Sequence, residues 1–83
     1  MFLSGELIKV VNFCHGLKVS DNVTQMKLPG IYEEDLHELT PGDIGIVVGS
    51  SFYEEVGWLV EAIFGDIVLA DILSENVTSA GAI

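Results

Sequence analysis

Apolar and polar residues alternate most regularly between residues 57 and 64. Because successive side chains of a β-strand point to opposite faces, the alternation divides this stretch into two sets: Trp58, Val60, Ala62 and Phe64, and then Leu59, Glu61 and Ile63. A second apolar run, 67–72, follows after Gly65-Asp66. A two-residue loop that begins with glycine is typical of a type II′ turn. The pattern therefore predicts an antiparallel hairpin made of residues 57–64 and 66–72.

Shorter apolar runs predict the other strands. Residues 6–13 and 44–48 are rich in aliphatic and β-branched side chains, which favour a pleated surface. The Thr-Pro-Gly-Asp sequence at 40–43 has the composition of a turn, and Gly45 indicates a bulge or a tight bend. Residues 49–57 are expected to form a polar and aromatic loop.

The stretch between the first strand and the turn has no sustained period. Residues 14–30 contain two glycines and a proline, and they are interpreted as a long excursion with a short strand piece at 17–19. Residues 32–39 carry apolar side chains at i, i+4 and i+7 and acids in the first turn, which is typical of a short helix. An irregular acidic loop fits the same residues equally well.

These segments together indicate an all-β fold. No helical pattern reaches ten residues, and about five short strands suit a small barrel or sandwich. Residues 1–77 are assigned to a single domain. Residues 78–83 are small and mostly uncharged, so they are expected to form a flexible tail.

One segment resembles a known family pattern. Leu39-Thr40-Pro41-Gly42-Asp43-Ile44-Gly45-Ile46-Val47-Val48 is similar to the L-x-P-G-D-x-G-x-V-V sequence of small SH3-like barrels. An aromatic loop and a hairpin, Leu59-Val60-Glu61-Ala62-Ile63-Phe64-Gly65, follow as they do in those proteins, so the resemblance covers residues 39–77. It implies an SH3-like barrel of about five strands. Relatives of this kind include translation-factor-type barrels and short bacterial accessory and phage proteins.

Two features of those barrels are missing here. The Ala-Leu-Tyr-Asp-Tyr signature of peptide-binding SH3 domains does not occur, so recognition of proline-rich peptides is not implied. Acids replace the basic loops of the nucleic-acid-binding barrels. The resemblance therefore concerns the fold and says little about function.

Composition adds an expectation of association. Hydrophobic residues make up 49% of the chain and charged residues only 19%, against about 25% charged in average proteins. A chain this short has little interior, and its single cysteine allows no intrachain disulfide. Part of its apolar material must lie at the surface, where it usually marks an interface. The chain is therefore expected to be stable only in association, through strand surface near Trp58, Leu59 and Ile63 or through a sheet edge.

Charge is distributed unevenly along the sequence. The formal net charge is −10, and residues 28–83 hold eleven acids and no base. Binding to phosphates requires Lys and Arg side chains, so the chain is expected to bind neither nucleic acid nor an anionic membrane. The partners that remain compatible with this charge are another protein and a second copy of the chain.

Few side chains suggest catalysis or metal binding. Cys14 and His15 are adjacent, and adjacent strand residues point to opposite faces, which argues against a nucleophile with its base. The histidines and the cysteine lack the spacing of a zinc site, and the acids lack the pattern of a calcium loop. No catalytic residue, metal or cofactor is expected.

Two segments are candidate protein-binding surfaces. One is an acidic run that would suit a basic partner: Tyr32, Glu33, Glu34, Asp35 and Glu38. The other is the aromatic loop, because aromatic side chains often anchor interfaces: Phe52, Tyr53, Glu54, Glu55 and Trp58. The acidic run has a plain alternative as a solvated face. For the aromatic residues, above all Trp58, the alternative is a place in the core.

The sequence thus favours a non-enzymatic protein-binding module or a subunit of a protein assembly. Two alternatives stay open. One is an acidic inhibitor that occupies the basic site of a nucleic-acid-binding protein, and the other is a homo-oligomeric structural component, such as a virion protein. Since the sequence has no long apolar segment and no basic leader, a location in the cytoplasm or in a virion is expected.

Overall fold

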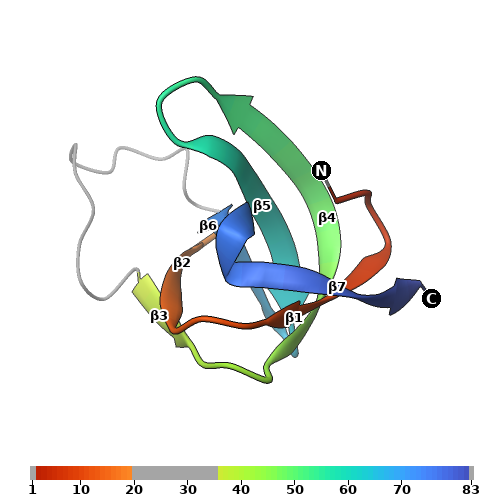
Figure 1. The fold of residues 1–83 in the computed structure, drawn as a ribbon. Helices are drawn as coiled ribbons and strands as arrows, with labels where there is room; N and C mark the ends of the chain where they lie inside the picture. The colour runs from red at the N-terminus through yellow and green to blue at the C-terminus, as the bar shows by residue number, and fades with distance from the viewer. Residues whose placement is uncertain (1, 20–35, 83) are drawn as a thin grey trace.

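A single antiparallel sheet runs through the structure and curls into a half-barrel (Figure 1). The computed structural model describes residues 2–19 and 36–82. Within them, the order of the strands across the sheet is β3-β2-β6-β5-β4-β1-β7. The elements are β1 (Glu6–Val10), β2 (Cys14–Lys18), β3 (Leu36–Leu39), β4 (Ile44–Tyr53), β5 (Gly57–Phe64), β6 (Ile67–Leu73), the 3-10 turn η2 (Ser74–Asn76) and β7 (Val77–Ala82).

The predicted hairpin is confirmed as β5 and β6. The two strands pair antiparallel from Leu59↔Leu73 to Phe64↔Ile67. Gly65, the first residue of the loop between them, has a φ of 66°, which glycine adopts without steric cost. The period-two pattern and the turn residues therefore agreed with each other and with the fold.

The inner side of the curled sheet holds the hydrophobic core. Val60 and Ala62, which the alternation placed on one face, are fully buried there, and Phe64 packs against them. Trp58 lies beyond this core and is only partly buried. The buried residues come from six of the strands: Ile8, Val10, Leu39, Val47, Val60, Ala62, Leu69, Ile72 and Val77.

Two strand glycines are required by close packing. A Cβ atom on Gly16 would lie 2.8 Å from the Cβ of Leu69, and one on Gly45 would lie 2.7 Å from the ring of Phe64. Gly16 thus allows β2 to lie close to the buried Leu69 side chain. Gly45 makes room for an aromatic ring, and the bulge in β4 lies between Val47 and Gly49 instead.

The predicted turn at 40–43 joins β3 to β4. The Asp43 amide donates a hydrogen bond to the Thr40 carbonyl (3.1 Å), and the Thr40 amide donates to the Asp43 carboxylate (2.9 Å). Gly42 has a φ of 103°. The Gly42 amide also donates to the Val10 carbonyl (2.8 Å), so the turn fixes the start of β4 beside the end of β1.

Several expectations about the number and extent of strands are wrong. The first strand ends at Val10 and not at residue 13, and residues 14–18 of the expected excursion form β2. The described residues form seven strands instead of about five. Residues 36–39, expected in a helical turn, form β3, because they pair with β2 from Cys14↔Leu39 to Leu17↔Leu36. The rest of that expected helix, 32–35, lies outside the described residues. Most of the loop expected at 49–57 belongs to β4, which continues to Tyr53.

The flexible tail expected from residue 78 is replaced by a strand. Val77–Ala82 forms β7 and pairs with β1 from Glu6↔Ala82 to Val10↔Val77. Its small side chains show no alternation of apolar and polar residues, so the sequence alone does not indicate a strand here. The strand forms because the free edge of β1 offers hydrogen-bonding groups and because Val77 is buried in the core.

We expect Gly16→Ala to lower the free energy of unfolding by about 1–3 kcal/mol, the usual cost of overpacking a filled core. The matched control is Gly49→Ala, because a Cβ at Gly49 meets nothing within 4 Å, and its effect should stay within about 0.5 kcal/mol. Urea denaturation followed by circular dichroism measures both. Equal effects of the two substitutions would contradict the close approach of β2 to β6.

Candidate functional site

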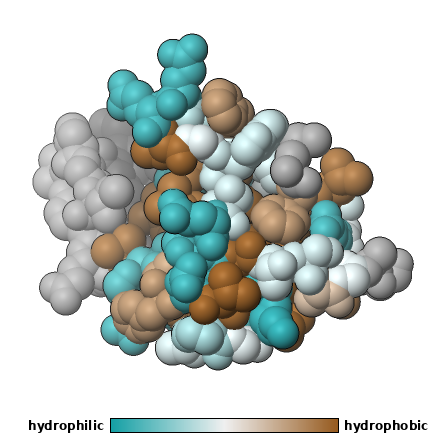
Figure 2. All heavy atoms as spheres, in the orientation of Figure 1, coloured by the Kyte–Doolittle hydropathy of each residue, from teal (hydrophilic) through white to brown (hydrophobic). Residues whose placement is uncertain are grey.

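The β4–β5 hairpin reaches beyond the core and carries an open hollow near its tip. The hollow has a volume of about 770 Å³. Hydrophilic residues gather at the hairpin tip, at the top of the view in Figure 2. The lining combines aromatic, aliphatic and carboxylate groups from the hairpin and from β6: Phe52, Tyr53, Glu54, Glu55, Val56, Leu59 and Asp71.

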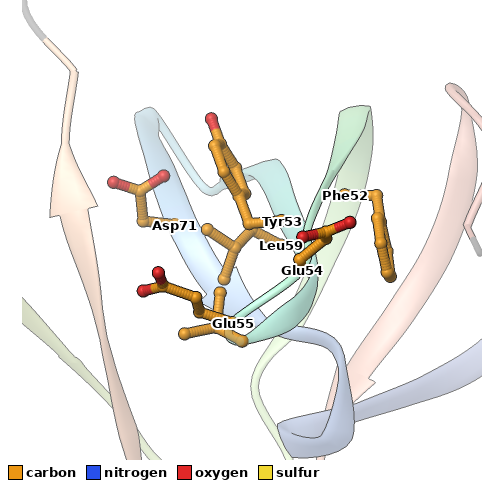
Figure 3. A pocket seen from close by; sticks show the side chains of 7 residues that line it. Phe52, Tyr53, Glu54, Glu55, Leu59 and Asp71 are labelled. Atoms are coloured by element: carbon orange, nitrogen blue, oxygen red, sulfur yellow. The ribbon is translucent and has the colours of Figure 1, made fainter.

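Strand register decides which of these side chains meet. Residues that pair across antiparallel strands point to the same face, so the pair Phe52↔Trp58 lies on the inner side. Tyr53, the next residue, therefore points to the outer side, and its partner Gly57 has no side chain to fill the space beside the phenol ring. In Figure 3 the Tyr53 ring and the Glu55 and Asp71 carboxylates lie together, and Phe52 points away from them.

Asp71 reaches the hollow because of a bulge in β6. Val60 pairs with Ile72 and Ala62 with Leu69, so two residues of β6, Ala70 and Asp71, lie opposite the single residue Glu61. The extra residue places Asp71 at a φ of 59°. Within residues 2–19 and 36–82 it is the only non-glycine residue with a positive φ. A left-handed backbone costs an L-residue about 1–2 kcal/mol, although aspartate tolerates it better than most residues.

The predicted aromatic loop contributes most of this site. Phe52, Tyr53, Glu54 and Glu55 all line the hollow. Trp58 is not among the lining residues. Its ring lies on the inner side, where its centroid is 5.4 Å from that of Phe52.

The predicted acidic run does not join the hollow where the structure describes it. Glu38 lies on β3, opposite His15, and β2 and β6 separate this edge strand from β5. Tyr32, Glu33, Glu34 and Asp35 lie outside the described residues.

Sequence reasoning missed three lining residues. Val56 lies inside the predicted loop at 49–57 but was not chosen as a binding residue, and Leu59 was named only for the expected association surface. Asp71 had no signal in the sequence, because a bulge depends on how two strands pair and not on the composition of either.

Cys14 and His15 are placed apart on β2. The Cys14 side chain packs against the core, whereas His15 is exposed and its ring meets that of Phe13 edge-on, with 5.3 Å between the centroids. Partial burial raises the pKa of the Cys14 thiol, and the negative charge of Asp43 raises it further. Both effects reduce the fraction of thiolate, the form that reacts as a nucleophile.

Metal-binding groups do not converge in the part of the chain that the structure describes. No three of its His, Cys, Asp and Glu side chains are arranged to hold an ion. Over residues 2–19 and 36–82, no helix has the length and apolar character needed to cross a membrane.

No family model, no curated protein and no solved structure matches the chain. The chemistry of the hollow and of the sheet surface is therefore the basis for inferring a function.

We expect Asp71→Asn to change the free energy of unfolding by less than about 0.5 kcal/mol, because asparagine also tolerates a left-handed backbone. Asp71→Val should lower it by about 1–2 kcal/mol, since a β-branched side chain does not tolerate this conformation. Thermal unfolding measured by calorimetry distinguishes the two. If valine were as well tolerated as asparagine, β6 would not have the bulge described above.

Cys14 should react several-fold more slowly with a thiol reagent such as dithionitrobenzoate than a free cysteine does at the same pH. The raised pKa leaves less thiolate at any pH below it, and partial burial limits access. The same protein unfolded in urea is the control, and its rate should return to that of a free thiol. A native rate equal to the unfolded rate would contradict this placement.

Proposed function

We propose that this chain is a non-enzymatic protein-binding module whose β4–β5 hollow receives a basic segment of its partner. One observation carries the proposal: the side chains of three acids, Glu54, Glu55 and Asp71, line a hollow that is also lined by Tyr53 and Leu59. Acidic and apolar groups in one concave site suit a side chain that has a positively charged end and an aliphatic stem.

Lysine and arginine are such side chains. Their aliphatic stems can pack on an apolar surface while the charged end stays near polar groups. In this hollow the stem would lie against Leu59 and the Tyr53 ring, and the charged end would meet a carboxylate. Charge-assisted hydrogen bonds to carboxylates are the stronger kind, and an aromatic ring adds a cation–π attraction.

The backbone of Asp71 supports the same proposal. Residues in sparsely populated conformations concentrate at binding and active sites, because a folded chain keeps them only where other interactions hold them. Here the strained residue carries one of the three carboxylates of the hollow. A bulge that orients the Asp71 carboxylate toward a partner accounts both for the positive φ of this residue and for its place in the hollow.

The charge of the whole chain favours a partner of opposite sign. A net charge of −10 attracts a basic protein over long range and raises its association rate. An acidic inhibitor of a nucleic-acid-binding protein is the second candidate, favoured by the same charge. Charge would dominate such a complex, so its affinity would fall steeply with salt, whereas burial against Tyr53 and Leu59 would give a shallower dependence.

We also propose that the half-barrel is related to the SH3-like barrels. The turn at 40–43 followed by β4, β5 and β6 agrees with the resemblance over residues 39–77, although seven strands exceed the five of that pattern. A bacterial accessory or phage role, in the cytoplasm or in a virion, is part of this proposal.

The capped tripeptide acetyl-Gly-Lys-Gly-amide is a suitable probe of the hollow. We expect it to shift the backbone amide signals of residues 53–56 and 71 in ¹⁵N–¹H spectra, saturably, with a Kd of roughly 1 mM, since a single side chain supplies only about −4 kcal/mol. The uncharged analogue with norleucine in place of lysine should bind at least about tenfold more weakly. Equal binding of the two peptides, or shifts that do not saturate, would overturn the proposal.

Charge-neutralising variants locate the binding. Asp71→Asn and Glu55→Gln should each weaken binding of the lysine peptide about three- to tenfold, because each removes a carboxylate from the lining. Asp66→Asn is the matched control: Asp66 is an exposed acid in the β5–β6 turn and does not line the hollow. It should leave the affinity unchanged. An equal loss in all three variants would mean that overall charge, and not the hollow, binds the peptide.

A further inference from the structure

A row of aliphatic side chains crosses the outer side of the sheet. The pairings Leu7↔Ile46, Ile46↔Ile63 and Ile63↔Val68 join β1, β4, β5 and β6. Because paired residues of antiparallel strands point to the same face, these four side chains lie side by side on one face.

This row belongs to the outer side and not to the core. Ile8, Val47, Ala62 and Leu69, each next in sequence to a member of the row, are fully buried on the inner side. Side chains alternate between the two faces, so the row points away from the core. Ile46 is exposed, and Leu7, Ile63 and Val68 are partly buried. Apolar surface that stays accessible on an outer face is typical of an interface.

The outer side of β4 extends the row along the strand. Ile44 is 49% exposed, Ile46 37% and Val48 43%. Three large aliphatic side chains within five residues of one strand thus remain accessible. None of the three lines the hollow, whose first lining residue on β4 is Phe52, four residues after Val48.

Two opposite charges flank the row. Lys9 pairs with Ile44, two residues before Ile46, and Glu61 pairs with Gly49, three residues after it. Lys9 lies on β1 and Glu61 on β5, the two neighbours of β4. Ile46 therefore lies between a positive and a negative side chain on the same face.

We propose that two copies of this chain meet through this face, in a symmetric dimer centred on Ile46, with Lys9 of each copy beside Glu61 of the other. A twofold axis in the plane of the face, perpendicular to the line from Lys9 to Glu61 and passing over Ile46, exchanges these two positions. Such an axis brings Ile46 of one copy against Ile46 of the other, where the two aliphatic rows cross. Self-complementary surfaces of this kind are what a twofold interface requires, and two sheets packed face to face are a common arrangement.

Charge selects a second copy as the occupant. Residues 28–83 contain eleven acids and no lysine or arginine. Most of the surface of one copy therefore repels the same surface of a second copy. The outer face instead carries a base and an acid that complement their own copies. Glu61 itself does not line the hollow, so a dimer through this face can be tested separately from the proposed function.

Reciprocal charge reversal tests this dimer. Lys9→Glu and Glu61→Lys should each weaken self-association by about tenfold, because each places like charges together at the interface. Mixing the two variants should restore association, since a heterodimer again pairs opposite charges at both positions. Sedimentation equilibrium reports a mass of twice the 9.0 kDa chain, and ¹⁵N labelling of one variant identifies the mixed species by mass spectrometry.

Glu75→Lys is the matched control, since Glu75 is an exposed acid on η2 and takes no part in the strand pairings that form the row. It has the same net charge as Glu61→Lys, so general repulsion predicts that both associate more strongly than the unmodified chain. The proposal predicts that only Glu61→Lys loses association. Circular dichroism establishes that each variant is folded.

Three results would overturn the proposal. They are an unmodified chain that stays monomeric at hundreds of micromolar, an association of Glu61→Lys equal to that of Glu75→Lys, and a mixture that associates no better than its components.

Discussion

The register of β5 against its two neighbours determines where most of the important side chains point. Pairing with β4 places Ile46 beside Ile63 on the outer side and Val47 beside Ala62 on the inner side. Since the two faces alternate with every residue, a slip by one position would expose the core and bury the outer row. The buried side chains Val60 and Ala62 oppose such a slip, because they would lose their apolar contacts.

Two bulges adjust this register locally. The one in β4 lies between Val47 and Gly49, and the one in β6 includes Asp71. Bulges bend a strand and redirect single side chains without changing the rest of the ladder. The bulge in β6 has a consequence for function, because it brings a carboxylate to a hollow that is otherwise built from a hairpin.

Local patterns in the sequence predicted the parts of the fold that depend on near neighbours. The β5–β6 hairpin followed from alternation and from Gly65, and the turn at 40–43 followed from its composition. Features that depend on distant strands could not be predicted in this way. β7 has no hydrophobic period and forms against β1, and Asp71 joins the site only through the pairing of β5 with β6. For the same reason the aromatic loop was found as a candidate and its acidic neighbour on β6 was not.

The outer surface is divided between two kinds of chemistry. Tyr53 and Ile46 are seven residues apart on β4, roughly 23 Å along an extended strand. On β6, however, Asp71 of the hollow lies opposite Glu61, so a basic segment in the hollow and Lys9 of a second copy would meet neighbouring carboxylates. A chain with a small core and no disulfide would gain stability from the second contact, because binding to the folded state shifts the folding equilibrium.

The arrangement depends on strand register, and cross-strand nuclear Overhauser effects measure register directly. The structure predicts backbone contacts of Ile46 with both Leu7 and Ile63, together with a strong contact between the amide and α protons of Asp71, as a positive φ requires. Contacts of Ile63 with Val47 in place of Ile46, or a negative φ at Asp71, would contradict the account of both the hollow and the aliphatic row.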